Sequence, residues 1–264
     1  GWALPIIGII FIIYSLMGTR QGIIPINIPG IFFHRGFQWN KLIGHLFSNT
    51  EGIYGTSVNV SSTYIFLFIV FGEVMNKSGM GKFLNDISIG LAGHTKGGPA
   101  KVAVIASGLL GSINGSAVAN VVTTGTFTIP LMKKVGYSKE FAGAVESTAS
   151  VGGQLLPPIM GATAFIMAET LGIQYREIVI AAAIPAIIYY LGIIFQIQLK
   201  ASKEDLGGMS KEDLPSLSET LKNYWHLTIP ILFLVYMLFF SGFTVIRGAF
   251  FTIILTIIVA QLRK

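Results

Sequence analysis

The sequence contains no cysteine and very little charge. Without cysteine, a small fold held by disulfides and a cysteine-ligated metal site are both excluded. Charged residues make up only 11% of the 264 positions, whereas a typical soluble domain carries about 25%. Hydrophobic residues reach 52% and the mean hydropathy is +0.70. Too little charge is present to cover a soluble domain, so the composition is typical of an integral membrane protein.

Common signatures of catalysis are also missing from the sequence. It has no His-Glu-x-x-His, Gly-x-Ser-x-Gly or Walker motif, and its four histidines are scattered. We therefore expect no enzyme activity, no catalytic metal and no cofactor. A membrane-embedded enzyme would have to rely on Glu73, Glu146 or Glu169. The net charge of +6 is explained by basic loops on one side of a membrane, so no nucleic-acid partner is expected.

Long stretches without charge predict membrane-spanning helices. A helix needs about 20 apolar residues to cross the hydrocarbon core, and these stretches lack the alternation of barrel strands. The sequence predicts an all-α polytopic membrane protein with about six transmembrane helices. Of the 18 lysines and arginines, 13 fall on one side, which the positive-inside rule makes cytoplasmic. The predicted spans are 2–18, 60–76, 139–171, 177–199, 224–241 and 246–262.

Two connecting segments have amphipathic helical patterns. Apolar residues recur at helical spacing in 38–50, which indicates a helix lying in the outer membrane interface. The cytoplasmic loop 200–223 contains Ser216 and Glu219 at capping-box spacing, beside leucines that share one face. A short helix on the cytoplasmic surface is therefore expected there.

The charge-free stretch 102–132 is too long for one straight span. Its middle, Gly111-Ser-Ile-Asn-Gly-Ser116, has the composition of a turn. We expect a re-entrant helical hairpin over residues 99–132, with its tip inside the membrane. The basic residues do not test this prediction, because a full crossing would give a similar charge bias with the opposite orientation.

The stretch 139–171 is interrupted as well. Gly152, Gly153 and Gln154 are followed by Pro157 and Pro158, and proline removes backbone donors and clashes with the preceding helical turn. A broken helix is predicted here. Irregular backbone at this depth is tolerated only when it is buried in protein or lines a wet cavity.

These two interruptions are the candidate ion- and substrate-binding site. Ser112, Asn114 and Ser116 supply side-chain oxygens, and Gly115 frees backbone carbonyls; this composition suits Na⁺. The alternative is close helix packing through Gly111 and Gly115. Paired discontinuities favour the transport interpretation. The full candidate set also includes Asn120, Thr123, Thr124, Gly152, Gly153, Gln154, Pro157 and Pro158.

One acidic residue, Glu146, precedes the broken segment and is a candidate for ion coupling, because an ionisable group inside a membrane is a functional hypothesis by default. The alternative is a structural role, in which Glu146 pairs with Lys139 or with a hydroxyl group.

The interrupted segments resemble the large membrane subunit of TRAP (tripartite ATP-independent periplasmic) transporters. Their residues look like those of the TAXI branch of this family, in which the small and large membrane subunits are commonly fused. The stretches that carry the resemblance are Gly111–Pro130, Gly136-Tyr137, Ala142–Glu146, Gly152–Ala162 and Phe165–Glu169.

The resemblance implies an elevator-type secondary transporter driven by Na⁺, or by H⁺ in some members, in a bacterial or archaeal cytoplasmic (inner) membrane. Its substrates would be organic acids or amino acids delivered by a periplasmic solute-binding protein. Further implied partners are a small membrane subunit or fused domain, the lipid bilayer and the remaining half of the large subunit. By position, Ser112, Asn114, Gly115 and Ser116 would form the first Na⁺ site.

We therefore expect half of an inverted-repeat transporter with three regions. Residues 1–98 would be scaffold helices with the outer interfacial helix, 99–175 the transport-type element, and 176–264 further transmembrane helices. The resemblance also implies a second, symmetry-related half with its own hairpin and broken helix. No second hairpin of this kind is found in these 264 residues, so we expect no transport by this chain alone. Two alternatives stay open: a non-transporting membrane scaffold, and the membrane-embedded enzyme.

Overall fold

The computed structural model describes residues 1–18, 21–26, 29–210, 212 and 214–261. Within these ranges the chain is helical, and the only strand-like pairing is an isolated bridge between Met17 and Ile24. The predicted all-α class is confirmed. Four of the basic residues counted for the orientation lie outside the described residues: Arg20, Lys211, Arg263 and Lys264.

The chain divides into two compact units, Gly1–Asn59 and Val60–Lys264. The first contains α1 (Ala3–Leu16) and α2 (Trp39–Ser48), which pack together. These helices coincide with the predicted span 2–18 and the predicted amphipathic segment 38–50. Leu42 is the buried residue of α2, as its apolar face requires. The placement of α2 in the membrane interface stays a prediction.

The second unit begins within a long helix. This helix consists of α3 (Thr56–Val60), a π-helical turn (Ser61–Ile65) and α4 (Phe66–Lys77), and it contains the predicted span 60–76. The helix that follows, α5 (Met80–Ala92), lies between the predicted span 60–76 and the predicted hairpin, where no helix was predicted. It was not predicted because α5 contains charged residues, and the spans were predicted from stretches without charge.

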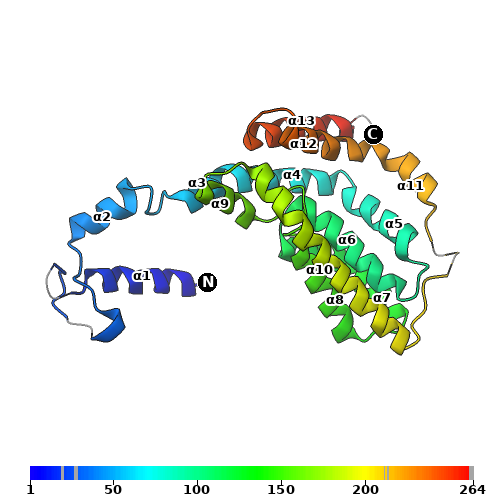
Figure 1. Cartoon of the computed structure of the whole chain (residues 1–264), viewed down its shortest axis with the longest axis horizontal. Helices are drawn as coiled ribbons and strands as arrows, with labels where there is room; N and C mark the ends of the chain where they lie inside the picture. The colour runs from blue at the N-terminus through cyan, green and yellow to red at the C-terminus, as the bar shows by residue number, and fades with distance from the viewer. Residues whose placement is uncertain (19–20, 27–28, 211, 213, 262–264) are drawn as a thin grey trace. The chain divides into compact units, whose positions relative to one another are not determined.

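Two helices form the predicted hairpin: α6 (Gly98–Asn114) and α7 (Ala117–Lys134) pack against each other on either side of a two-residue turn. The broken helix is also present, as α8 (Lys139–Gly152) and α9 (Ala162–Leu171), separated by a non-helical segment. Both helices of the hairpin pack on α8 (Figure 1). That the hairpin is re-entrant stays a prediction.

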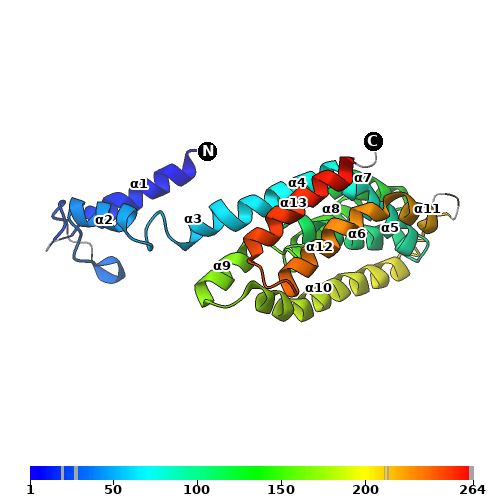
Figure 2. The ribbon, with the colours of Figure 1, turned by 90° about the horizontal axis from the view of Figure 1, so that it is seen from above.

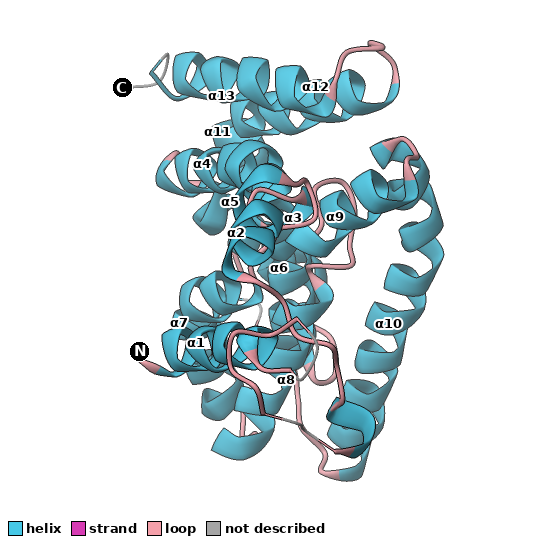
Figure 3. Cartoon of the chain, turned by 90° about the vertical axis from the view of Figure 1, so that its left-hand side faces the viewer, coloured by secondary structure: helices cyan, strands magenta, loops and turns pink. Residues whose placement is uncertain are grey.

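Further helices follow α9 along the chain. The longest, α10 (Tyr175–Lys203), packs against α6, α8 and α9, and Figure 3 shows its full length. The short α11 (Leu217–Tyr224) begins at Ser216, whose Oγ accepts a hydrogen bond from the Glu219 N–H at 3.4 Å, as the capping spacing predicted. The last two helices, α12 (Thr228–Phe239) and α13 (Val245–Gln261), lie side by side, and α13 also packs on α4 (Figure 2).

Among the described residues, two helices are long and apolar enough to cross a membrane, Thr56–Lys77 and Tyr175–Lys203. Ala3–Leu16, Ala162–Leu171 and Val245–Gln261 are apolar but shorter. This agrees with a membrane protein, and the number of about six spans stays a prediction.

The second unit has two clusters of buried apolar residues. The larger joins the hairpin helix α6 to α4, α5, α9, α10 and the non-helical segment after α8, and includes Phe71, Leu110, Ile159 and Phe165. The smaller joins α6, α7, α8 and α10. The hairpin is therefore anchored on two faces, which fixes the position of its tip.

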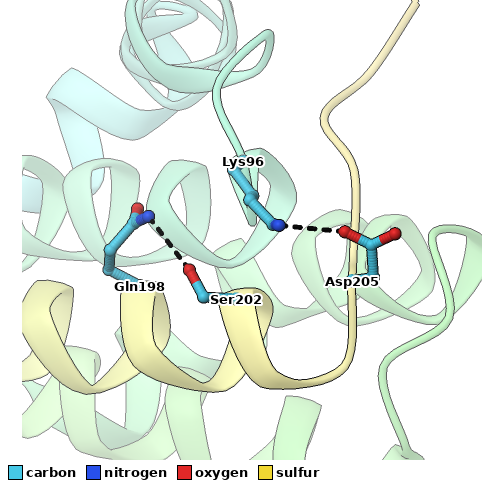
Figure 4. Close-up of polar contacts among 4 residues, drawn as sticks. All are labelled: Lys96, Gln198, Ser202 and Asp205. Carbon is cyan, nitrogen blue, oxygen red and sulfur yellow. Dashed lines mark hydrogen bonds and ion pairs between the residues drawn. The ribbon is translucent and has the colours of Figure 1, made fainter.

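The connection after α10 is fastened to the connection before α6 (Figure 4). Lys96 Nζ donates to Asp205 Oδ1 at 2.9 Å, and the Gly97 N–H donates to the Leu206 carbonyl at 3.2 Å. The hydrogen bond and the charge of Lys96 lower the pKa of the Asp205 carboxyl. The end of α10 and the start of the hairpin are thus held together outside the predicted spans.

Candidate functional site: the hairpin tip and the broken helix

The hairpin reverses over Gly115 and Ser116. Gly115 has a φ of 64°, a left-handed conformation that glycine adopts easily, and its N–H donates to the Gly111 carbonyl at 2.9 Å. Asn114 Oδ1 accepts from the Ser116 N–H at 3.1 Å, and Ser116 Oγ accepts from the Ala119 N–H at 3.3 Å. The tip oxygens therefore cap the turn and the first turn of α7.

The non-helical segment between α8 and α9 lies directly against this tip. The Ile159 N–H donates to the Ser112 carbonyl at 3.2 Å, so the end of α6 hydrogen-bonds to the backbone of the broken helix. The segment contains a cis peptide bond between Pro157 and Pro158. Its carbonyls at Pro158 and Ile159 accept hydrogen bonds from the Tyr175 hydroxyl.

A glycine pair allows the two elements to cross closely. A Cβ atom built on Gly153 would lie 2.6 Å from Gly111 Cα, and one built on Gly111 would lie 2.8 Å from Gly153 Cα. Real Cβ contacts are longer than this, so both positions need glycine. The packing role expected for Gly111 is thus present, and its partner is the broken helix.

A cavity of about 270 Å³ lies where the tip meets the broken helix. It brings together four of the predicted site residues, Asn114, Gly115, Ser116 and Gln154. Thr163 adds a hydroxyl, and no charged side chain lines the cavity among the described residues. The rest of the lining is apolar: Ile65, Phe68, Ile69, Ile159, Met160, Ala162 and Phe165.

Other predicted residues do not line this cavity. The buried Ser112 hydroxyl donates to the Leu109 carbonyl of its own helix at 2.8 Å. Thr123 likewise donates to the Ala119 carbonyl at 2.8 Å. Residues outside the lining are Ser112, Asn120, Thr123, Thr124, Gly152, Gly153, Pro157 and Pro158.

Asn120 and Thr124 belong to a second polar cluster, deeper between α6, α7 and α8. Its centre is Glu146, which is fully buried. Ser107 Oγ lies 2.8 Å and Ser150 Oγ 3.1 Å from Glu146 Oε1, and Thr128 Oγ1 lies 2.6 Å from Oε2. Thr124 also donates to Oε1. We call Ser107, Thr124, Thr128, Glu146 and Ser150 the Glu146 cage.

The cage decides between the two structural partners expected for Glu146. The partners are hydroxyls, whereas Lys139 lies 3.9 Å from Glu140 on the surface. Ser107, Thr128 and Ser150 were not predicted as site residues. A signal was available for two of them, since Thr124 with Thr128 and Glu146 with Ser150 are spaced by four residues and so share a helix face.

The donor set at the tip limits which ions could bind. It offers hydroxyl, amide and backbone carbonyl oxygens, and no group of three His, Cys, Asp or Glu residues occurs anywhere in the described ranges. Transition metals favour imidazole and thiolate ligands. Neutral oxygens at the end of an interrupted helix are instead the ligands found for Na⁺ in transporters.

A helical hairpin whose tip faces an interrupted helix is typical of one class of proteins, the secondary-transporter permeases, whose sites form at paired helix discontinuities. The family comparison gives the particular family. Residues 1–264 match the model of the tripartite ATP-independent periplasmic transporter, DctM component. The chain belongs to this family, which is one of transporter permeases and not of enzymes.

Curated relatives agree with this assignment. A putative TRAP transporter large permease protein of Haemophilus influenzae is 28% identical over 62% of this chain and 39% of its own length. The 2,3-diketo-L-gulonate TRAP transporter large permease protein YiaN of Escherichia coli is 24% identical over 67% and 42%. The C4-dicarboxylate TRAP transporter large permease protein DctM of Pseudomonas aeruginosa is 26% identical over 69% and 42%. The chain thus spans about two fifths of the length of these relatives.

Proposed function

We propose that this chain forms one half-site of a multi-pass TRAP permease in the cytoplasmic (inner) membrane, coupled to Na⁺ and working by an elevator mechanism. A periplasmic solute-binding protein would deliver the substrate. The small membrane subunit or fused domain and the remaining half of the large subunit would complete the transporter. Uptake then requires the assembled complex, because the described residues contribute one hairpin and the family resemblance implies a site built from two.

One observation carries the proposal: the tip residues Asn114 to Ser116 face the broken helix across one cavity. Two interrupted helices that meet at one cavity provide backbone and hydroxyl oxygens without protein charge, which favours a weakly held monovalent cation. Weak binding is necessary for transport, since the ion must also leave. We place Na⁺ at Asn114, Gly115 and Ser116, and treat H⁺ as the alternative coupling ion. The Ser112 hydroxyl, expected in the same site, instead donates to the Leu109 carbonyl of its own helix.

The substrate class follows from the relatives together with the cavity. The names of two relatives refer to a C4-dicarboxylate and to 2,3-diketo-L-gulonate, which are both organic acids. We propose organic acids or amino acids for this permease as well. The apolar lining would pack against the substrate carbon chain, while Gln154 and Thr163 offer polar contacts.

The test is Na⁺-driven uptake by proteoliposomes that contain the complete transporter. Asn114→Ala and Ser116→Ala each remove one side-chain oxygen from the proposed ion site. Loss of about 1 kcal/mol of binding should raise the Na⁺ concentration for half-maximal uptake roughly fivefold. Ser147→Ala is the matched control, because Ser147 is exposed on α8 and bonds only to its own helix.

Unchanged Na⁺ activation in both tip variants would contradict the assignment of the ion site. The competing interpretation, a non-transporting scaffold, makes a different prediction. A complete complex whose uptake tolerates Gly115→Trp, which would fill the tip cavity, would favour the scaffold.

A further inference from the structure

We propose that the Glu146 cage is a second cation site, separate from the hairpin tip, which binds one small monovalent cation, a proton or Na⁺. The binding property rests on the cage alone. Its role in coupling rests on the proposed function.

The Glu146 carboxyl group is buried and has no positively charged partner among the described residues. Glu146 has no exposed surface, and among the described residues no Lys, Arg or His forms an ion pair with it. Hydroxyl hydrogen bonds compensate only part of the cost of removing a carboxylate from water. A cation bound to the carboxylate would neutralise the charge of Glu146 directly.

The ionisable groups on the surrounding helices do not supply that cation. On α6, Lys101 donates to Gln198 at 2.6 Å, and on α8, Lys139 faces Glu140. The lysines at the end of α7 are exposed. On α10, Lys200 pairs with Glu204, and Tyr189 and Tyr190 donate to backbone carbonyls of α8 at 2.9 and 2.8 Å.

Two hydroxyl groups of the cage, those of Thr124 and Thr128, have two possible hydrogen-bond acceptors each. Thr124 Oγ1 lies within reach of Glu146 and also 2.8 Å from the Asn120 carbonyl. Thr128 Oγ1 lies 2.6 Å from Glu146 and 3.0 Å from the Thr124 carbonyl. When the site holds no cation, the hydroxyls donate to the carboxylate. When a cation binds, they can turn to the carbonyls and present lone pairs to it.

An unsatisfied oxygen adjoins the cage. Asn120 is fully buried, and its Oδ1 has no hydrogen-bond partner in the structure. Its Nδ2 donates to the Ser107 carbonyl at 2.7 Å, and its own carbonyl accepts from Thr124, so Asn120 contacts two members of the cage. Buried polar atoms are nearly always satisfied. A free acceptor on a residue that contacts two members of the cage is a position that a bound cation, or a water molecule on that cation, would satisfy.

The experiment uses the complete transporter purified in detergent, with the thermal unfolding midpoint as the readout. One arm lowers the pH in a choline medium without Na⁺. The other raises Na⁺ at constant pH in a Ser116→Ala background, over the concentrations below the roughly fivefold higher range in which the weakened tip should respond. We expect the wild-type cage to raise the midpoint in one arm, which identifies the cation as H⁺ or Na⁺. Glu146→Gln should abolish that response.

Matched controls separate the cage from general effects of charge. Glu140→Gln removes an exposed carboxylate from the same helix and should keep the response. Should Glu146→Gln fail to fold, Thr128→Val weakens the cage while keeping the charge, and we expect it to raise the cation concentration for half-maximal response at least threefold. Thr126→Val changes an exposed threonine on the same helix and should leave the cation concentration for half-maximal response unchanged.

The inference is overturned if the wild type responds in neither arm, or if Glu146→Gln responds as the wild type does. Uptake separates it from the proposed function. If Glu146→Gln loses gradient-driven uptake while the tip variants keep normal Na⁺ activation, the result supports a cation site in the Glu146 cage and refutes the Na⁺ site at the hairpin tip. The reverse pattern refutes the cage and leaves the tip site intact.

Discussion

Replacing Gly153 by alanine tests how the broken helix meets the hairpin. Gly153 has φ −57° and ψ −29°, an ordinary helical conformation that alanine adopts without strain. The added methyl group would nevertheless lie 2.6 Å from Gly111 Cα and 2.9 Å from the Gly111 carbonyl carbon. Both atoms belong to backbone, so neither can move aside as a flexible side chain would. The cost of the substitution therefore comes from the close approach alone.

The expected magnitude follows from overpacking. Forcing extra atoms into a packed contact costs about 1–3 kcal/mol. Gly143→Ala is the matched control, because Gly143 lies in the same helix and a Cβ atom there would meet nothing within 4 Å. That variant should gain about 0.5–1 kcal/mol from helix propensity. At about 2–4 °C per kcal/mol for a chain of this size, the two variants should differ by several degrees.

The assay is thermal unfolding of the purified permease in detergent, followed by circular dichroism. Gly111→Ala should behave like Gly153→Ala, because the two positions share one contact. Once one methyl group has pushed the segments apart, the second costs less, so the double variant should lose less stability than the sum of the single variants. Equal midpoints for Gly153→Ala and Gly143→Ala would refute the close-approach reasoning.

Two further predictions concern the same region. Gly115→Ala and Gly172→Ala both place alanine at a left-handed φ (64° and 65°), which costs about 1–2 kcal/mol. Only Gly115 also meets the Met160 carbonyl, so it should lose roughly 1–3 kcal/mol more in chemical unfolding; equal losses would contradict the contact. Tyr175→Phe removes the hydroxyl that holds the Pro158 and Ile159 carbonyls and should cost about 1 kcal/mol. The exposed Tyr236→Phe should change stability by less than about 0.5 kcal/mol, and hydrogen exchange at residues 159–161 should increase only for Tyr175→Phe.

The hairpin and the broken helix were predictable because their causes are local. Glycine, serine and asparagine at 111–116 end one helix and begin the next through backbone conformation and capping, which depend on neighbours in sequence. The helix α5 was not predictable from missing charge, because its apolar face is visible only as a periodicity among charged residues. For a similar reason, sequence proximity wrongly grouped Asn120 and Thr124 with the tip.

Sequence alone determined that the chain is helical, poor in charge, and interrupted by glycine and proline at two places, since composition and local backbone preferences fix these properties. Only the tertiary structure decided which interruptions and polar groups meet. Gln154 reaches the tip cavity from a different helix, and Ser107 reaches Glu146 across 39 positions of sequence. Such contacts depend on how α6, α7 and α8 pack. Packing brings together residues that lie far apart in the sequence, and their separation in the sequence does not predict their distance in space.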